Sequence, residues 1–116
     1  MKRLFDEISY KTSKITTKNY STSFSFGILA LHKSLRKSIY NIYGFVRFAD
    51  EIVDSFHDYD KRMLFNKFQK DTFFAIENQI SLNPILNSFQ ETVNTYNIDL
   101  SLINNFLGSM ELDLLE

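Results

Sequence analysis

The stretch IYGFVRFADEIVDSF, residues 42–56, decides the fold that we expect for this chain. Each residue of an α-helix advances roughly 100° around the axis, and in that projection apolar side chains occupy nearly the whole circumference. A helix that is apolar almost all round is surrounded by neighbours. The sequence therefore predicts a central helix from about Leu35 to Phe56, with Ser34 as its N-cap. One apolar stripe contains Leu35, Ile39, Ile42, Val46, Ala49, Val53 and Phe56, and the opposite side contains Phe45, Phe48 and Ile52.

A narrow polar strip interrupts this apolar surface. It consists of Tyr43, Arg47, Asp50 and Asp54, which stand at i, i+4, i+7 and i+11 and fall within an arc of about 60°. Buried Arg and Asp are rare unless they are paired or bind a metal. One interpretation is a solvated strip with an Arg47–Asp50 or Arg47–Asp54 ion pair. The other is a strip that faces an internal cavity, where both carboxylates bind Mg²⁺ and the guanidinium binds phosphate oxygens.

The composition of the chain excludes several classes of function. Its 116 residues are 44% hydrophobic and 23% charged, which is typical of one ordinary globular domain. A net charge of −1 without a long basic run argues against nucleic-acid binding. The absence of Cys excludes disulfides and thiolate chemistry. No apolar run reaches the roughly 18 residues of a membrane-spanning helix, and the N-terminus does not resemble a signal peptide, so we expect a cytoplasmic protein.

The rest of the chain also has helical spacing. One Pro and three Gly are few helix breakers for this length, which predicts an all-α protein with short connections. The first predicted helix has a weakly apolar side that includes Leu4 and Ile8. The predicted helices besides the central one run from about Arg3 to Thr17, from Ser23 to Leu31, from the cap Asp60 to Asn78, from Pro84 to the sequence NTYNID, and from Asp99 onward.

The final segment, LSLINNFLGSMELDLLE at residues 100–116, keeps a helical apolar period up to its last residues. We therefore expect the sequence to be a fragment that stops inside a helix. Packing surfaces around Val53 and Leu107 are then expected to be open. Exposed apolar surface of this kind predicts self-association of the chain.

Residues 20–56, YSTSFSFGILALHKSLRKSIYNIYGFVRFADEIVDSF, resemble the N-terminal signature of the phytoene/squalene synthase family. That family shows a Ser-x-Ser-Phe segment, then Leu-Arg, then a helix with Tyr-Ala-Phe-x-Arg-x-x-Asp-Asp-x-x-Asp. Near the end of the chain, GSMELDLLE resembles the family's Gly-Met-x-x-Asp-Leu stretch and places Asp113 on its aspartate. The other matching positions are Ser21, Ser23, Phe24, Leu35, Arg36, Tyr43, Arg47, Asp50, Glu51 and Asp54.

The resemblance implies an all-α isoprenoid-synthase-type helical bundle, truncated after about five or six helices, with residues 1–116 as the N-terminal portion of a single domain. It implies an enzyme that joins two prenyl diphosphates (farnesyl or geranylgeranyl) head to head and makes a carotenoid, squalene or hopanoid precursor. Asp50 and Asp54 would be catalytic residues that bind Mg²⁺, which assists the departure of diphosphate. The implied substrate-binding residues are Ser21, Ser23, Tyr43, Arg47 and Asp113.

The chain departs from the family pattern in three respects. Tyr20 stands where many members have His, and Glu51, off the polar strip, replaces the middle Asp. The family's second aspartate-rich motif belongs downstream of residue 116, so the 116 residues alone are expected to be inactive. The resemblance also implies peripheral membrane contact for product release.

The rival interpretation is a non-catalytic helical bundle that acts as a scaffold or partner-binding module. Arg47, Asp50 and Asp54 oppose it, because a pure scaffold would gain stability if such buried charges were replaced.

Overall fold

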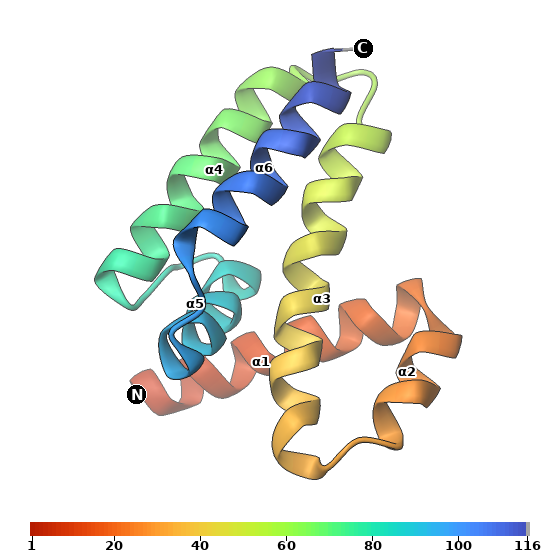
Figure 1. Ribbon diagram of the computed structural model, residues 1–116, viewed down its shortest axis with the longest axis vertical. Coiled ribbons are helices and arrows are strands. Elements are labelled where there is room, and N and C mark those ends of the chain that lie inside the picture. Colours follow the sequence, from red (N-terminus) through yellow and green to blue (C-terminus); the bar gives the residue numbers. More distant parts are fainter. Residues whose placement is uncertain (116) are drawn as a thin grey trace.

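The computed structural model describes residues 1–115, which form six α-helices and no strand (Figure 1). The all-α prediction is confirmed, and every predicted helix is present. Within this part of the chain, no helix has both the length and the apolar character needed to cross a lipid bilayer. The helices are α1 (Lys2–Tyr20), α2 (Thr22–Leu29), α3 (Lys33–Asp54), α4 (Lys61–Asn78), α5 (Pro84–Tyr96) and α6 (Leu100–Leu115).

Side-chain caps determine where several of these helices begin. The Asp60 carboxylate accepts a hydrogen bond of 3.1 Å from a backbone amide in the first turn of α4, as predicted. Asn83 caps α5, and Pro84 occupies its first position. At α3 the predicted cap, Ser34, is wrong. Nδ1 of His32 accepts a hydrogen bond of 3.2 Å from the Ser34 amide, so the helix begins one residue before Ser34.

Helix α3 is the central helix, as predicted. It packs against each of the other five helices, and in Figure 1 it runs between the α4–α6 pair and α2. At its middle, Phe45 is 2% exposed and stacks on Phe89 of α5 with ring centroids 3.8 Å apart. The Phe68 ring of α4 lies 5.3 Å from the Phe45 ring. The core of the molecule is therefore built around stacked aromatic rings.

The buried residues of α3 include members of both of its predicted apolar sides, together with Tyr40, Asn41 and Gly44, which belong to neither. Ala49 lies on the predicted stripe, whereas Phe45 and Ile52 lie on the opposite side, and all three are buried. The two ends of the stripe are exposed: Leu35 in the first turn, and Phe56 beyond the end of the helix, where φ is 55°. Neighbouring helices thus enclose the middle of α3 from several directions and leave its ends open.

Helix α1 packs through small polar residues instead of apolar ones. Its buried residues are Ser9, Ser13, Thr16 and Thr17. The weakly apolar side predicted from Leu4 and Ile8 faces outward, and both residues are about half exposed. Oγ of Ser13 lies 2.5 Å from Oγ of Ser88 in α5. Side chains of this size allow the helices to approach closely, and they bury few apolar atoms.

Candidate functional site

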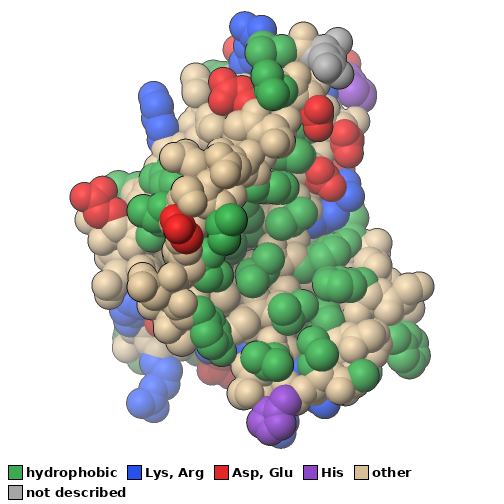
Figure 2. Space-filling model, viewed as in Figure 1, with side chains coloured by type: hydrophobic (Ala, Val, Ile, Leu, Met, Phe, Trp, Pro, Cys, Tyr) green, Lys and Arg blue, Asp and Glu red, His purple; other side chains and the backbone are tan. Residues whose placement is uncertain are grey.

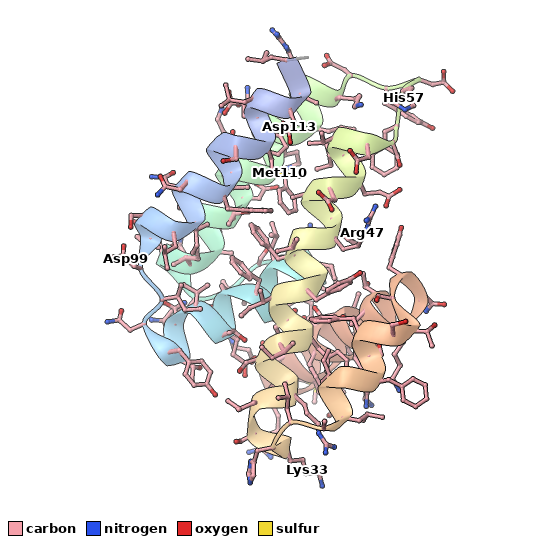
Figure 3. All side chains as sticks on the ribbon, turned by 45° about the vertical axis from the view of Figure 1, so that its right-hand side comes forward. Lys33, Arg47, His57, Asp99, Met110 and Asp113 are labelled. Carbon is pink, nitrogen blue, oxygen red and sulfur yellow. The ribbon has the colours of Figure 1, made fainter. Side chains whose placement is uncertain are left out.

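The polar strip lies on a single helix, as predicted, because Tyr43, Arg47, Asp50 and Asp54 all belong to α3. Figure 3 shows Arg47 on the outer side of α3 and Asp113 on the adjacent helix α6. The side chains of Arg47 and Asp50 are 25% and 38% exposed, and Asp54 is exposed. The prediction that the strip faces a closed interior is therefore wrong for Asp54. Within residues 1–115, no helix covers this side of the last turn of α3.

Arg47 is held by partners from two directions. Its Nη2 donates to Oε2 of Glu51 at 2.9 Å, and its Nη1 lies 3.7 Å from Oδ2 of Asp50. The ring of Tyr20, from the end of α1, lies 4.7 Å from the guanidinium carbon. The Arg47–Asp50 ion pair, one of the two pairs predicted from the sequence, is present. The shorter contact is to Glu51, at i+4 on the same helix.

The pKa values around this ion pair shift in a consistent direction. Two hydrogen bonds lower the pKa of the Glu51 carboxyl. The larger effect comes from Arg47, and the second comes from Oγ of Ser55 at 2.8 Å. The hydrogen bond to Glu51 raises the pKa of Arg47 against the opposing effect of burial. Burial raises the pKa of Tyr20, and the nearby Glu51 carboxylate raises it further. Glu51 and Arg47 are therefore both charged at neutral pH, and the Tyr20 hydroxyl is neutral.

Negative charges on two helices act on the carboxyl group of Asp50. Burial raises the pKa of Asp50, and Arg47 counteracts that effect. The negative charges of Asp54 and Glu51 on α3, and of Asp113 on α6, raise the pKa further. Asp113 is far from Asp50 in the sequence, so the effect of its charge on Asp50 depends on the fold. A cation at Asp50 would remove the repulsion between these carboxylates.

The donor set at this position suits Mg²⁺, which takes oxygen ligands and commonly uses one or two carboxylates together with substrate phosphates. Asp50 and Asp54, one turn apart on α3, supply two such carboxylates. Among residues 1–115, however, no three His, Cys, Asp or Glu side chains are grouped closely enough to hold a metal ion by themselves. The described residues therefore fit one side of a metal–diphosphate site.

The other end of the strip adjoins the turn between α1 and α2. The Tyr43 ring lies 5.0 Å from the ring of Phe24 in α2. Ser21 is the N-cap of α2, and its Oγ accepts a hydrogen bond of 3.2 Å from the Phe24 amide. Ser23 is exposed in the first turn of the same helix. The structure thus brings the α2 N-terminus next to Tyr43 and Tyr20 next to Arg47.

An apolar groove of about 180 Å³ lies beside the strip, between α3, α5 and α6. Two of its α3 residues, Ile42 and Val46, directly precede Tyr43 and Arg47 in the sequence. Its lining is almost entirely apolar. The groove is formed by Ile42, Phe45, Val46, Phe89, Ile98, Leu102, Ile103 and Phe106.

Sequence reasoning missed two contributors to the site. Glu51 stands at i+4 from Arg47, a spacing that favours an ion pair on a helix, so the sequence contained a signal for this contact. The contact of Tyr20 with Arg47 carries no such signal, because it depends on how α1 ends against α3.

One of three comparisons with known proteins supports the resemblance found in the sequence. The model of the Squalene/phytoene synthase family matches residues 17–116. That range includes α2 to α6 and all of the candidate site residues. Comparison with curated proteins and with solved structures gives no match. Because the family match extends over most of its 116 residues, the chain belongs to the squalene/phytoene synthase family.

Proposed function

We propose that this chain contributes one wall of the active site of a prenyltransferase that joins two prenyl diphosphates head to head. Family membership implies a prenyltransferase-type enzyme in general. The observation that carries the finer proposal is the geometry of the polar strip on α3, where Asp50 and Asp54 stand one turn apart and Nη1 of Arg47 lies 3.7 Å from Asp50. Two carboxylates one turn apart on a helix repel each other mildly, and a bound cation removes that repulsion. A diphosphate accompanied by Mg²⁺ offers a cation to these carboxylates and anionic oxygens to Arg47.

Asp50 and Asp54 are the residues that would hold Mg²⁺ in this proposal. When bound, Mg²⁺ neutralises diphosphate oxygens and makes diphosphate a better leaving group. Arg47 would bind the same oxygens through the accessible part of its guanidinium, where Nη1 makes only a long contact of 3.7 Å, with Asp50, among the ion pairs of residues 1–115. Asp113 adds negative charge near Asp50 from α6.

Ser21 and Ser23 would contact diphosphate oxygens from the α2 N-terminus, where the helix dipole favours negative charge. Tyr43 and the apolar groove beside it would receive the prenyl chain of a farnesyl or geranylgeranyl substrate. An apolar chain gains free energy from burial in such a groove, at about 25 cal/mol per Å² of apolar surface removed from water. The diphosphate and the prenyl chain would thus occupy adjacent positions along α3.

The test is a pair of substitutions, Asp50→Asn and Asp54→Asn, assayed for product formation in the complete protein with Mg²⁺ and a prenyl diphosphate. We expect each to lower turnover by more than about 100-fold, because each removes a charged ligand from the reaction centre. Thermal melts should show an unchanged or slightly higher Tm, because a repelling carboxylate is removed.

Asp58→Asn, in the exposed turn between α3 and α4, is the matched control and should retain normal turnover. Near-normal turnover in both site variants would overturn the proposal and favour the non-catalytic scaffold. A large fall in Tm together with lost turnover would also contradict it, since the carboxylates would then serve folding.

A further inference from the structure

A cluster of buried polar side chains joins α1 to α5. Nδ2 of Asn87, in α5, donates to Oδ1 of Asp6 at 2.8 Å and to Oγ of Ser9 at 3.1 Å, both in α1. Further along α1, the hydroxyl oxygens of Ser13 and Ser88 lie 2.5 Å apart. We call these five residues the α1–α5 cluster. Four of them are 0% exposed, and the side chain of Asp6, at the rim, is 26% exposed.

Asn87 is also held from its own side of the contact. Its Oδ1 accepts hydrogen bonds of 3.1 Å from the backbone amide of Ser81 and of 3.4 Å from Nε2 of Gln90. A backbone amide can only donate, so the Ser81 contact determines which atom of the Asn87 side chain is the oxygen and leaves the nitrogen facing α1. All four hydrogen-bonding positions of this side chain are therefore used. Asn87 cannot follow a displacement of α1 without losing bonds within its own segment.

The packing of α1 depends on these directional bonds. Its buried residues are Ser and Thr only, whereas hydrophobic side chains gather over α2 and α3 on the face shown in Figure 2. Small side chains form low ridges, which do not lock one helix against another. In a slip of one residue, the neighbouring side chain is offset by about 1.5 Å along the axis and about 100° around it, which no hydrogen bond tolerates. The α1–α5 cluster therefore fixes the position of α1 relative to α5.

The far end of α1 reaches the candidate site. In Figure 1, α1 runs behind α3, from the N-terminus near α5 to the turn before α2. The ring of Tyr20, its last residue, lies 4.7 Å from the central carbon of the Arg47 guanidinium. Ser13 stands seven residues before Tyr20, which is about 10 Å along a helix. Because α1 is unbroken between them, a displacement at the α1–α5 cluster is carried to Tyr20.

We propose that Asn87 is a positioning residue for Arg47: it holds α1 in register and thereby keeps the Tyr20 ring over the guanidinium. Asn87 does not touch the substrate and acts through α1. The kinetic consequence rests on the proposed function, in which Arg47 binds diphosphate oxygens, but the structural coupling does not. The alternative is a cluster that only stabilises the fold. Buried polar groups stabilise an interior less than apolar side chains do, and their best-attested role is to fix registry.

The first test is a double-mutant cycle in the complete protein, assayed with Mg²⁺ and a prenyl diphosphate well below the Tm of every variant. Asn87→Ala should lower kcat/KM by about five- to ten-fold, where about ten-fold corresponds to complete loss of the Tyr20–Arg47 contact. In a Tyr20→Ala background, Asn87→Ala should change kcat/KM by less than about two-fold, because the contact on which it acts is already absent.

Thr92→Val is the matched control. Thr92 lies in α5 and is 4% exposed, and its Oγ1 accepts a buried hydrogen bond of 3.1 Å from Nδ2 of Asn41 in α3. The variant removes a buried hydrogen bond from the same helix, but the partner is not in α1. It should lower Tm and leave kcat/KM within about two-fold. If Asn87→Ala does not fold, Asp6→Ala combined with Ser9→Ala removes the same two hydrogen bonds from the α1 side.

The second test requires no enzymatic activity. It follows the Nε–H resonance of Arg47 by nuclear magnetic resonance, because Nε is buried and an aromatic ring over a guanidinium shifts the resonances of its protons. Asn87→Ala should move this resonance toward its position in Tyr20→Ala. Thr92→Val should leave it in place.

A cross-link tests whether the effect passes through α1. Residues 1–116 contain no Cys, and the hydroxyl oxygens of Ser13 and Ser88 are 2.5 Å apart, close to the roughly 2.05 Å between the sulfur atoms of a disulfide. Ser13→Cys combined with Ser88→Cys, added to Asn87→Ala, should restore the Arg47 resonance and kcat/KM when oxidised. Both should be lost again when a reductant breaks the disulfide.

An unchanged Arg47 resonance in folded Asn87→Ala would overturn the inference. A loss of kcat/KM that multiplies with that of Tyr20→Ala, or that Thr92→Val matches, would also overturn it. If the complete protein forms no product, the proposed function fails, and the Arg47 resonance still decides whether Asn87 positions this side chain.

Discussion

At the scale of single residues, Arg47 is the most constrained side chain of the candidate site. Glu51 fixes one edge of its guanidinium at 2.9 Å, and the Tyr20 ring covers the group at 4.7 Å from its central carbon. A guanidinium that lies over an aromatic ring and is paired on one edge has little rotational freedom left. In the proposed function, Arg47 is therefore oriented before the diphosphate arrives, and Tyr20 acts as a positioning residue.

Tyr20→Ala should lower kcat/KM for the prenyl diphosphate by about ten-fold, which corresponds to the loss of one partly desolvated cation–π contact. Tyr20→Phe keeps the ring and should remain within about two-fold of the unmodified enzyme, since the stacking survives without the hydroxyl. Steady-state kinetics with both variants would measure the difference, and thermal melts would check that their stabilities match. Equal kinetics for Tyr20→Ala and the unmodified enzyme would show that the contact does not orient Arg47.

At the scale of helices, local signals in the sequence were sufficient to predict that each helix exists and roughly where it ends. They were not sufficient to predict which side of every helix is buried. Asp60, Asn83 and Pro84 predicted the starts of α4 and α5 because capping is a contact between near neighbours in the chain. The face of α1 could not be predicted in this way. Its Ser and Thr residues are buried because α1 lies very close to α3, and that distance depends on residues far away in the sequence.

At Gly44, α3 packs closely against Ser13 of α1 and Ile85 of α5. A Cβ atom added at Gly44 would lie 3.0 Å from Oγ of Ser13 and 3.2 Å from Cδ1 of Ile85. We expect Gly44→Ala to destabilise the fold by about 1–3 kcal/mol, as for other overpacked interiors. This loss should outweigh the gain in helix propensity that Ala has over Gly.

Gly27 and Gly108 provide matched controls for this prediction. Both lie inside helices, and an added Cβ meets no atom within 4 Å at either position. Gly27→Ala and Gly108→Ala should therefore each raise stability, by up to about 1 kcal/mol. Urea unfolding of the three variants would measure these differences. A Gly44→Ala variant as stable as the two controls would mean that α1 can move away from α3 at no cost.

At the scale of the whole molecule, the sequence predicted the central helix and its polar strip, but not which surfaces remain open. Val53 and Leu107 were expected to be open. Instead, Leu107 is fully buried, and Val53 is partly buried against the core. The prediction was wrong because the side of α6 that carries Leu107 packs against the core. The opposite side of α6 is exposed: Leu102 is 62% exposed and Leu112 is 65% exposed. The spacing of apolar residues in the sequence identifies an apolar helix, but the packing of adjacent helices determines which of its sides are buried.

This open side of α6 predicts that the chain associates with itself. Leu102 also lines the apolar groove next to Ile42 and Val46, so a second copy that covers it would bury a continuous apolar surface. At about 25 cal/mol per Å², removal of a few hundred Å² from water contributes several kcal/mol, which is comparable with the stability of a small domain.

Light scattering over a range of concentrations should therefore show an average mass that rises with concentration. Leu102→Ser combined with Leu112→Ser should shift the midpoint of that rise to a concentration at least about ten-fold higher, since burial of each Leu side chain contributes about 1.5–3 kcal/mol when complete. Leu82→Ser, in the turn before α5, is the matched control: Leu82 is 89% exposed but lies outside the α6 surface. It should leave the midpoint unchanged. A mass that stays monomeric at every concentration would contradict the prediction, and an equal effect of Leu82→Ser would place the contact elsewhere.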